Sequence, residues 1–151
     1  MRHSVRASMI ILFLLFLPFL LLGLAGSCLA ATVDVGGAGD FTDIQSAIDA
    51  TKSGDTVLVK PGEYLITAPI TFKGKAIALL SESGPEATTI RMATPSDASR
   101  GSVVAFETKE GSASLLEGFT LTGGKGSSWA YAFASIGGGI RCLGASPTVR
   151  S

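Results

Sequence analysis

One stretch of the chain, Thr32 to Ser83, contains a single short amphipathic segment followed by brief β-branched runs that Gly and Pro separate. Ile44, Ala47 and Ile48 follow the i, i+3, i+4 spacing of one helical face, which predicts a helix at 43–52. The runs after it lack the tight hairpin dipeptides Asn-Gly and Asp-Gly, and no further amphipathic helix separates them. Short strands of this kind pair in parallel between successive coils, so the pattern predicts an all-β chain wound as a solenoid.

Thr42 is expected to begin the helix, with Gln45 three residues later at a capping-box spacing. Gly54 is expected to follow the end of the helix as a left-handed cap. Because so short a helix cannot bury its apolar stripe alone, we expect it to lie across the first coil, near Val57 and Val59.

Short apolar runs continue to the end of the chain. The expected strands are 32–35, 55–59, 64–66, 69–72, 76–80, 88–92, 102–106, 116–122, 139–142 and 148–150. Residues 123–135 are expected to form a longer turn. The segments 76–80 and 118–122 have similar contexts, and they belong either to one face of an enlarged coil or to coils two apart. Alternation predicts these inward-facing residues: Val57, Val59, Ile77, Leu79, Ile90, Val104, Phe106, Phe119, Leu121 and Ile140.

Residues 1–30 have the pattern of a signal peptide. Arg2 and Arg6 precede an apolar run from Met9 to Leu24, and the small residues Cys28 and Ala30 stand at the positions that a signal peptidase reads. An uncleaved membrane anchor is the alternative, although the run is slightly short for a span of about 20 residues. We therefore expect a secreted or cell-envelope protein, extracellular or periplasmic, that meets the membrane only through this segment.

The mature part, residues 31–151, has ten Lys and Arg against twelve Asp and Glu, a net charge of about −2. This balance argues against nucleic acid as a partner. The only histidine, His3, belongs to the signal segment, which excludes a Ser-His-Asp triad and a histidine-ligated metal in residues 31–151. Cys142 has no intramolecular partner there, so it is expected either to pack as a small apolar group or to pair with a cysteine beyond residue 151.

Four segments of the chain resemble a known family. The family is that of secreted right-handed parallel β-helix proteins of the pectin-lyase-like superfamily, pectin methylesterases included. Their cap-helix segment is similar to Gly39-Asp40-Phe41-Thr42-Asp43-Ile44-Gln45-Ser46-Ala47-Ile48. Their first-coil signature is similar to Gly54-Asp55-Thr56-Val57-Leu58-Val59-Lys60-Pro61-Gly62-Glu63-Tyr64. The segments 116–123 and 137–150 resemble later coils of bacterial β-helix repeat proteins.

The resemblance covers most of residues 32–151. It implies a right-handed parallel β-helix with a short N-terminal capping α-helix, of which residues 31–151 form the N-terminal coils. The segments recur in enzymes and non-enzymes alike, so they indicate a fold and not an activity. The chain ends directly after an expected strand, and we therefore expect a truncated β-helix.

Polysaccharide lyases of that superfamily use Lys or Arg as a base, often beside calcium that acids on one strand face hold. Calcium is thus the one cofactor that the resemblance implies, yet no two acids occupy positions i and i+2 of an expected strand, and helix capping explains Asp40 and Asp43. No metal ligand is assigned.

Glycoside hydrolysis needs two facing carboxylates. Glu107 and Glu110 are expected to be solvated loop charges and Glu117 to face outward, so no catalytic residue is assigned either.

Trp129, Tyr131 and Phe133 form an aromatic cluster in the expected longer turn. At positions i, i+2 and i+4 they are candidates for a carbohydrate-contact surface, since sugar rings stack on aromatic faces, and a polysaccharide or cell-surface glycan is the corresponding partner. The alternative is that this segment folds onto the coil beneath it.

Three functions remain open. The favoured one is a secreted β-helix protein with an extracellular carbohydrate- or surface-interaction role. The alternatives are the N-terminal fragment of a polysaccharide lyase or glycoside hydrolase whose active site lies beyond residue 151, and a structural or adhesion module of the cell envelope. A final coil built from Ile140, Cys142 and Val149 would expose strand edges beside an apolar surface, which predicts end-to-end self-association.

Overall fold

The computed structural model describes residues 30–129 and 132–151. Fourteen strands and one helix lie in these residues. The expected signal peptide, residues 1–30, falls outside the described part except for Ala30. Within the two described ranges, no helix is long and apolar enough to cross a membrane.

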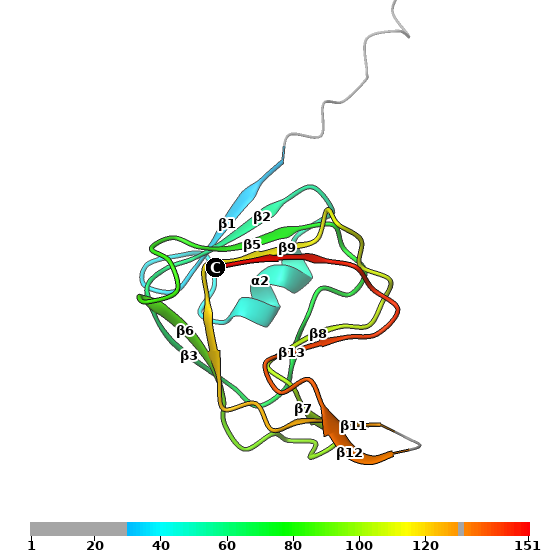
Figure 1. The fold of residues 1–151 in the computed structure, drawn as a ribbon. Coiled ribbons are helices and arrows are strands. Elements are labelled where there is room, and N and C mark those ends of the chain that lie inside the picture. The colour runs from blue at the N-terminus through cyan, green and yellow to red at the C-terminus, as the bar shows by residue number, and fades with distance from the viewer. Residues whose placement is uncertain (1–29, 130–131) are drawn as a thin grey trace, which may run out of the picture.

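Eleven of the described strands form three parallel sheets around a common centre (Figure 1). Sheet A contains, in order, β1 (Thr32–Val35), β2 (Thr56–Val59), β5 (Ala78–Ser81), β9 (Leu115–Glu117) and β14 (Thr148–Arg150). Sheet B contains β3 (Gly62–Ile66), β6 (Thr88–Met92) and β10 (Thr120–Thr122). Sheet C contains β4 (Ile70–Thr71), β8 (Val104–Phe106) and β13 (Ile140–Cys142). These three sheets are called the scaffold below.

From β2 onward, the chain passes through sheets A, B and C in this order three times before β14 returns to sheet A. Each return is parallel and places apolar residues in register. In sheet A, Val57 pairs with Leu79, Leu79 pairs with Leu116, and Leu116 pairs with Val149. The expectation of an all-β chain with parallel pairing is confirmed.

One apolar core lies between the three sheets. Seven of the ten residues expected to face inward are buried, and Phe119, Leu121 and Ile140 are partly buried and pack against the core. Phe72 and Phe106 meet inside it with ring centroids 4.7 Å apart and planes tilted by 46°. The core thus has the alternating residues and the aromatic packing that fill the interior of a multi-sheet fold.

Two expectations about strands are wrong. The single strand expected at 116–122 is two strands, β9 and β10, because Gly118 adopts a φ of 80° and turns the chain from sheet A into sheet B. The segments 76–80 and 118–122 therefore do not share a face, since their strands lie in sheets A and B. A glycine at the corner supplies a left-handed conformation that a side chain would disfavour.

The helix α2 (Ile44–Ala50) covers the start of the core, as expected. Its buried residues Ile44, Ala47 and Ile48 belong to the same apolar cluster as Val57 and Val59. Contacts with β1, β2 and β4 hold it over that end of the scaffold. The predicted position of the helix is confirmed.

The helix starts differently from the prediction. Asp43, and not Thr42, is the N-cap, and its carboxylate accepts a hydrogen bond of 2.8 Å from the backbone N–H of Ser46. Gln45 does not close a capping box. Its side chain instead exchanges two hydrogen bonds, of 2.9 and 3.1 Å, with the backbone of Thr71 in β4. Gln45 therefore ties the helix to the first strand of sheet C.

A lysine from the next repeat caps the other end of α2. The ammonium of Lys75 donates to the backbone carbonyls of Ile48, Asp49 and Thr51 at 2.6, 3.0 and 2.7 Å. The Ile48 carbonyl also accepts hydrogen bonds from the hydroxyl and the backbone N–H of Thr51, at 2.8 and 3.3 Å. Carbonyls in the last turn of a helix lack the usual i+4 donor, and the negative end of the helix dipole favours a cation beside them. Thr51 is the C-cap, so the expected cap at Gly54 lies beyond the actual end.

The remaining strands depart from parallel pairing. The strands β7 (Arg100–Gly101), β11 (Gly126–Trp129) and β12 (Ala132–Ile136) form an antiparallel sheet with β11 in the middle. The expectation of a longer turn at 123–135 is therefore wrong. The pair β11–β12, called the hairpin below, extends away from the scaffold (Figure 1).

Candidate functional site

The hairpin carries two of the three aromatic residues singled out in the sequence. Trp129 ends β11 and Phe133 lies in β12, whereas Tyr131 lies outside the described residues. Trp129 pairs with Ala132, the neighbour of Phe133, after a register shift between Ser128 and Trp129. The fold thus brings Trp129 and Phe133 into adjoining strands.

Close backbone contacts between glycines form the base of the hairpin. A Cβ on Gly101 would lie 2.5 Å from the carbonyl oxygen of Gly126, and one on Gly124 would lie even closer to that of Gly138. Both distances are too short for any side chain, so the chain enters and leaves the hairpin at a spacing that only glycine permits.

A buried polar pair also holds the base. The hydroxyls of Ser102 and Ser127 lie 2.8 Å apart, and both residues are fully buried. Ser127 belongs to β11 and Ser102 follows β7, so this hydrogen bond joins the hairpin to the segment that leads into sheet C. Buried hydroxyls are retained only where they find a partner, and each is the other's partner here.

Glu107 lies beside this base and does not behave as a solvated loop charge. One carboxylate oxygen accepts from Arg100 Nη2 at 2.5 Å and the other from Arg141 Nη1 at 3.3 Å. The Glu107 side chain is only 23% exposed. Both oxygens are therefore occupied by guanidinium groups.

Glu110 is a buried structural acid, and the expectation of a solvated charge is wrong. It is 2% exposed, and its carboxylate accepts from the backbone N–H groups of Gly74 at 2.9 Å and Thr108 at 2.8 Å. Burial alone would raise the pKa of the Glu110 carboxyl, but these backbone donors hold that pKa below its usual value. Glu110 thus joins the β4–β5 turn to the segment after β8.

Glu117, the third carboxylate considered for glycoside hydrolysis, faces outward as expected. It forms an exposed ion pair of 3.6 Å with Arg150 of the paired strand β14, whereas its neighbour Leu116 is buried. In the part of the chain that the structure describes, no three His, Cys, Asp or Glu side chains gather as a metal site would require. The three carboxylates thus have cationic or backbone partners.

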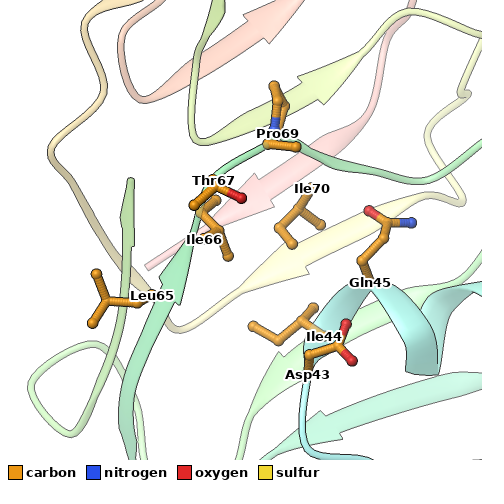
Figure 2. A pocket seen from close by; sticks show the side chains of 9 residues that line it. Asp43, Ile44, Gln45, Leu65, Ile66, Thr67, Pro69 and Ile70 are labelled. Carbon is orange, nitrogen blue, oxygen red and sulfur yellow. The ribbon is translucent and has the colours of Figure 1, made fainter. Parts of the chain in front are cut away.

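A hollow of about 240 Å³ lies between the first turn of α2 and the bend from β3 to β4. It is lined by Asp43, Ile44, Gln45, Leu65, Ile66, Thr67, Ala68, Pro69 and Ile70. Figure 2 shows Ile66 and Ile70 facing Ile44 across the hollow, whereas Leu65 points away. The carboxylate of Asp43 and the amide of Gln45 already serve the helix and β4, so the hollow offers mainly an apolar floor.

A second hollow of about 200 Å³ lies at the opposite end of the scaffold. Leu116, Phe119, Leu121, Ile140, Val149, Arg150 and Ser151 line it. Val149 is 47% exposed there. The predicted end-to-end self-association concerns this surface and stays a prediction.

Cys142 is exposed, which corrects the expectation that it packs as a small apolar group. It ends β13, the outermost strand of sheet C, and no further described strand covers it. Partial burial, together with the nearby Glu110 carboxylate, raises the pKa of the Cys142 thiol. The thiol is therefore protonated at neutral pH.

Several residues of the site were missed from the sequence, namely Arg100, Arg141 and the glycine contacts. One signal was present: aromatic residues at i, i+2 and i+4 have the period of a strand, and glycine clusters flank them on both sides. Comparison of the chain with protein-family models, curated proteins and solved structures finds no match. The hairpin and its base are therefore interpreted from their own residues and geometry.

Proposed function

We propose that residues 31–151 form coils of a secreted right-handed parallel β-helix that contacts carbohydrate or another extracellular surface through the hairpin. The repeated order of sheets A, B and C and the in-register apolar pairs support winding in coils. The signal-peptide pattern of residues 1–30 supports export. The family resemblance described above points to the same fold.

One observation carries the functional part of this proposal: the hairpin departs from the parallel scaffold, extends away from it, and bears Trp129 and Phe133 on adjoining strands. Recognition residues commonly stand on excursions that a rigid scaffold positions. Aromatic rings provide large, stiff contact surfaces that lose little conformational entropy on binding. A glycan whose sugar rings offer flat C–H faces is the ligand that such residues suit.

The test is binding of soluble xylan, polygalacturonate and mixed-linkage β-glucan, measured by affinity electrophoresis and calorimetry. We expect at least one of them to bind, and Trp129→Ala and Phe133→Ala each to weaken that binding by about tenfold or more. Leu65→Ala is the matched control, because Leu65 is 59% exposed on β3 of the scaffold. Equal binding by the wild type and both aromatic variants would refute a contact role for the hairpin.

A further inference from the structure

A single carboxylate connects the two sides of the hairpin. Arg100 lies in β7 and pairs with Ser127 of β11, on the side where the hairpin begins. Arg141 lies in β13, the strand that follows the hairpin, and its Cα would lie 3.0 Å from a Cβ placed on Gly137. Glu107 accepts hydrogen bonds from both arginines, with one oxygen for each. It therefore bridges the segments before and after the hairpin.

The strand register explains why Glu107 can reach Arg141. Arg141 pairs with Ala105 in the parallel ladder of β8 and β13. Glu107 follows Ala105 by two residues, and positions two apart along a strand face the same side. Glu107 directly follows the end of β8, so it lies on the same side as Ala105 and within reach of Arg141, and Arg100 approaches the same carboxylate from the antiparallel sheet.

The bridge is more shielded from water than the ion pairs on the scaffold faces. The Arg141 and Glu107 side chains are 13% and 23% exposed. The Arg141 Nε is buried and has no acceptor among the described residues. Loss of Glu107 would therefore leave a mostly buried guanidinium without its carboxylate, a cost that moving the segment into water would relieve.

We propose that Glu107 is a positioning residue that holds the hairpin, and with it the backbone positions of Trp129 and Phe133, in one orientation. This inference rests on the proposed carbohydrate contact for its functional consequence, but the orientation itself is measurable without a ligand. A hairpin fixed before binding loses less conformational freedom on contact, which strengthens affinity. Without the bridge, the same aromatic residues remain present on a more mobile hairpin.

Trp129 is the only tryptophan of the chain, so its fluorescence reports on the hairpin directly. The test compares Glu107→Gln with the wild-type chain by fluorescence anisotropy, by acrylamide quenching, and by affinity for whichever of the three polysaccharides the wild type binds. We expect lower anisotropy, stronger quenching and about tenfold weaker affinity, with cooperative unfolding retained. Glu63→Gln is the matched control, because Glu63 forms an Arg–Glu pair with Arg91 at 2.5 Å on sheet B.

Arg100→Gln is the second variant, and it keeps the test decisive if Glu107→Gln fails to fold. It removes only one arm of the bridge, at a side chain that is 38% exposed. If Glu107→Gln folds, we expect the Trp129 anisotropy and the polysaccharide affinity of Arg100→Gln to lie between those of the wild type and Glu107→Gln. If Glu107→Gln does not fold, we expect both values for Arg100→Gln to be lower than those of the wild type. Unchanged Trp129 fluorescence in both variants would overturn the positioning role. Altered fluorescence, with a Trp129→Ala variant that binds as the wild type does, would refute the carbohydrate contact and leave the positioning role standing.

Discussion

The scaffold and the hairpin are built by different means. Parallel ladders place alternating apolar residues in one core of the scaffold, such as Val57, Leu79 and Leu116 in sheet A. The hairpin is antiparallel, and its base depends on glycine contacts, a buried serine pair and the Glu107 bridge. Stability is therefore concentrated in the scaffold, whereas the hairpin provides a projecting surface. The two regions should respond differently to substitution.

The largest effect is expected where the core is capped. Ile48→Asp places a charge in the apolar cluster beneath α2, where Ile48 is 0% exposed. A buried charge without a partner is costly, so the variant should lose about 4 kcal/mol or more of unfolding free energy, measured by urea denaturation. Ser46→Asp on the exposed face of the same helix is the control and should unfold as the wild type does. A small loss in Ile48→Asp would mean that α2 does not cap the core.

A smaller loss, of about 2 kcal/mol, is expected for Glu110→Gln. The carboxylate joins two repeats through charge-assisted hydrogen bonds from Gly74 and Thr108, and a neutral amide accepts these bonds less well. Chemical denaturation at neutral pH would measure the loss. Glu86→Gln, the same substitution at an exposed glutamate, is the control and should unfold as the wild type does.

The pH dependence of the same residue gives a second readout. Since the pKa of Glu110 is lowered in the folded state, its contribution is fully present above the unfolded-state pKa of about 4.3 and is lost as the pH falls through the folded-state pKa. Wild-type stability should therefore decrease on acidification below about pH 4.5, and Glu110→Gln should show a shallower decrease. Parallel curves for the two proteins would contradict a structural role for the ionised carboxylate.

Gly124→Ala should act on the hairpin more than on the scaffold. The new methyl group would meet the carbonyl of Gly138 and force the two sides of the base apart. We expect a loss of about 1 kcal/mol in global stability together with a clear change in Trp129 anisotropy. Gly139→Ala is the matched control in the same segment, because nothing lies within 4 Å of its added methyl group. Identical fluorescence in both variants would show that the glycine contact does not set the hairpin position.

The sequence predicts the scaffold better than the hairpin for a physical reason. The helix stripe of Ile44, Ala47 and Ile48 and the inward residues of the first repeat are local periodic signals, and the structure confirms them. The hairpin has none of the dipeptides that mark tight turns, and long-range contacts such as Gly124 with Gly138 determine its base. Glu110 was misjudged for the same reason, since its partner Gly74 lies far away in the sequence.

The smallest expected effect on stability comes from the largest change. Replacing residues 128–135 with a short Gly-Ser turn removes most of the hairpin but keeps Ser127 and its hydrogen bond to Ser102. The strands on either side retain their partners, because β10 pairs with β6 and β13 pairs with β8 in the scaffold. Closing a loop of similar length has a nearly constant entropic cost, so the unfolding free energy should change by less than about 1 kcal/mol. Circular dichroism and urea denaturation would measure this, with polysaccharide binding lost in the same protein. A large loss of stability or of cooperativity would instead mean that the hairpin belongs to the folding core and that the two regions are one unit.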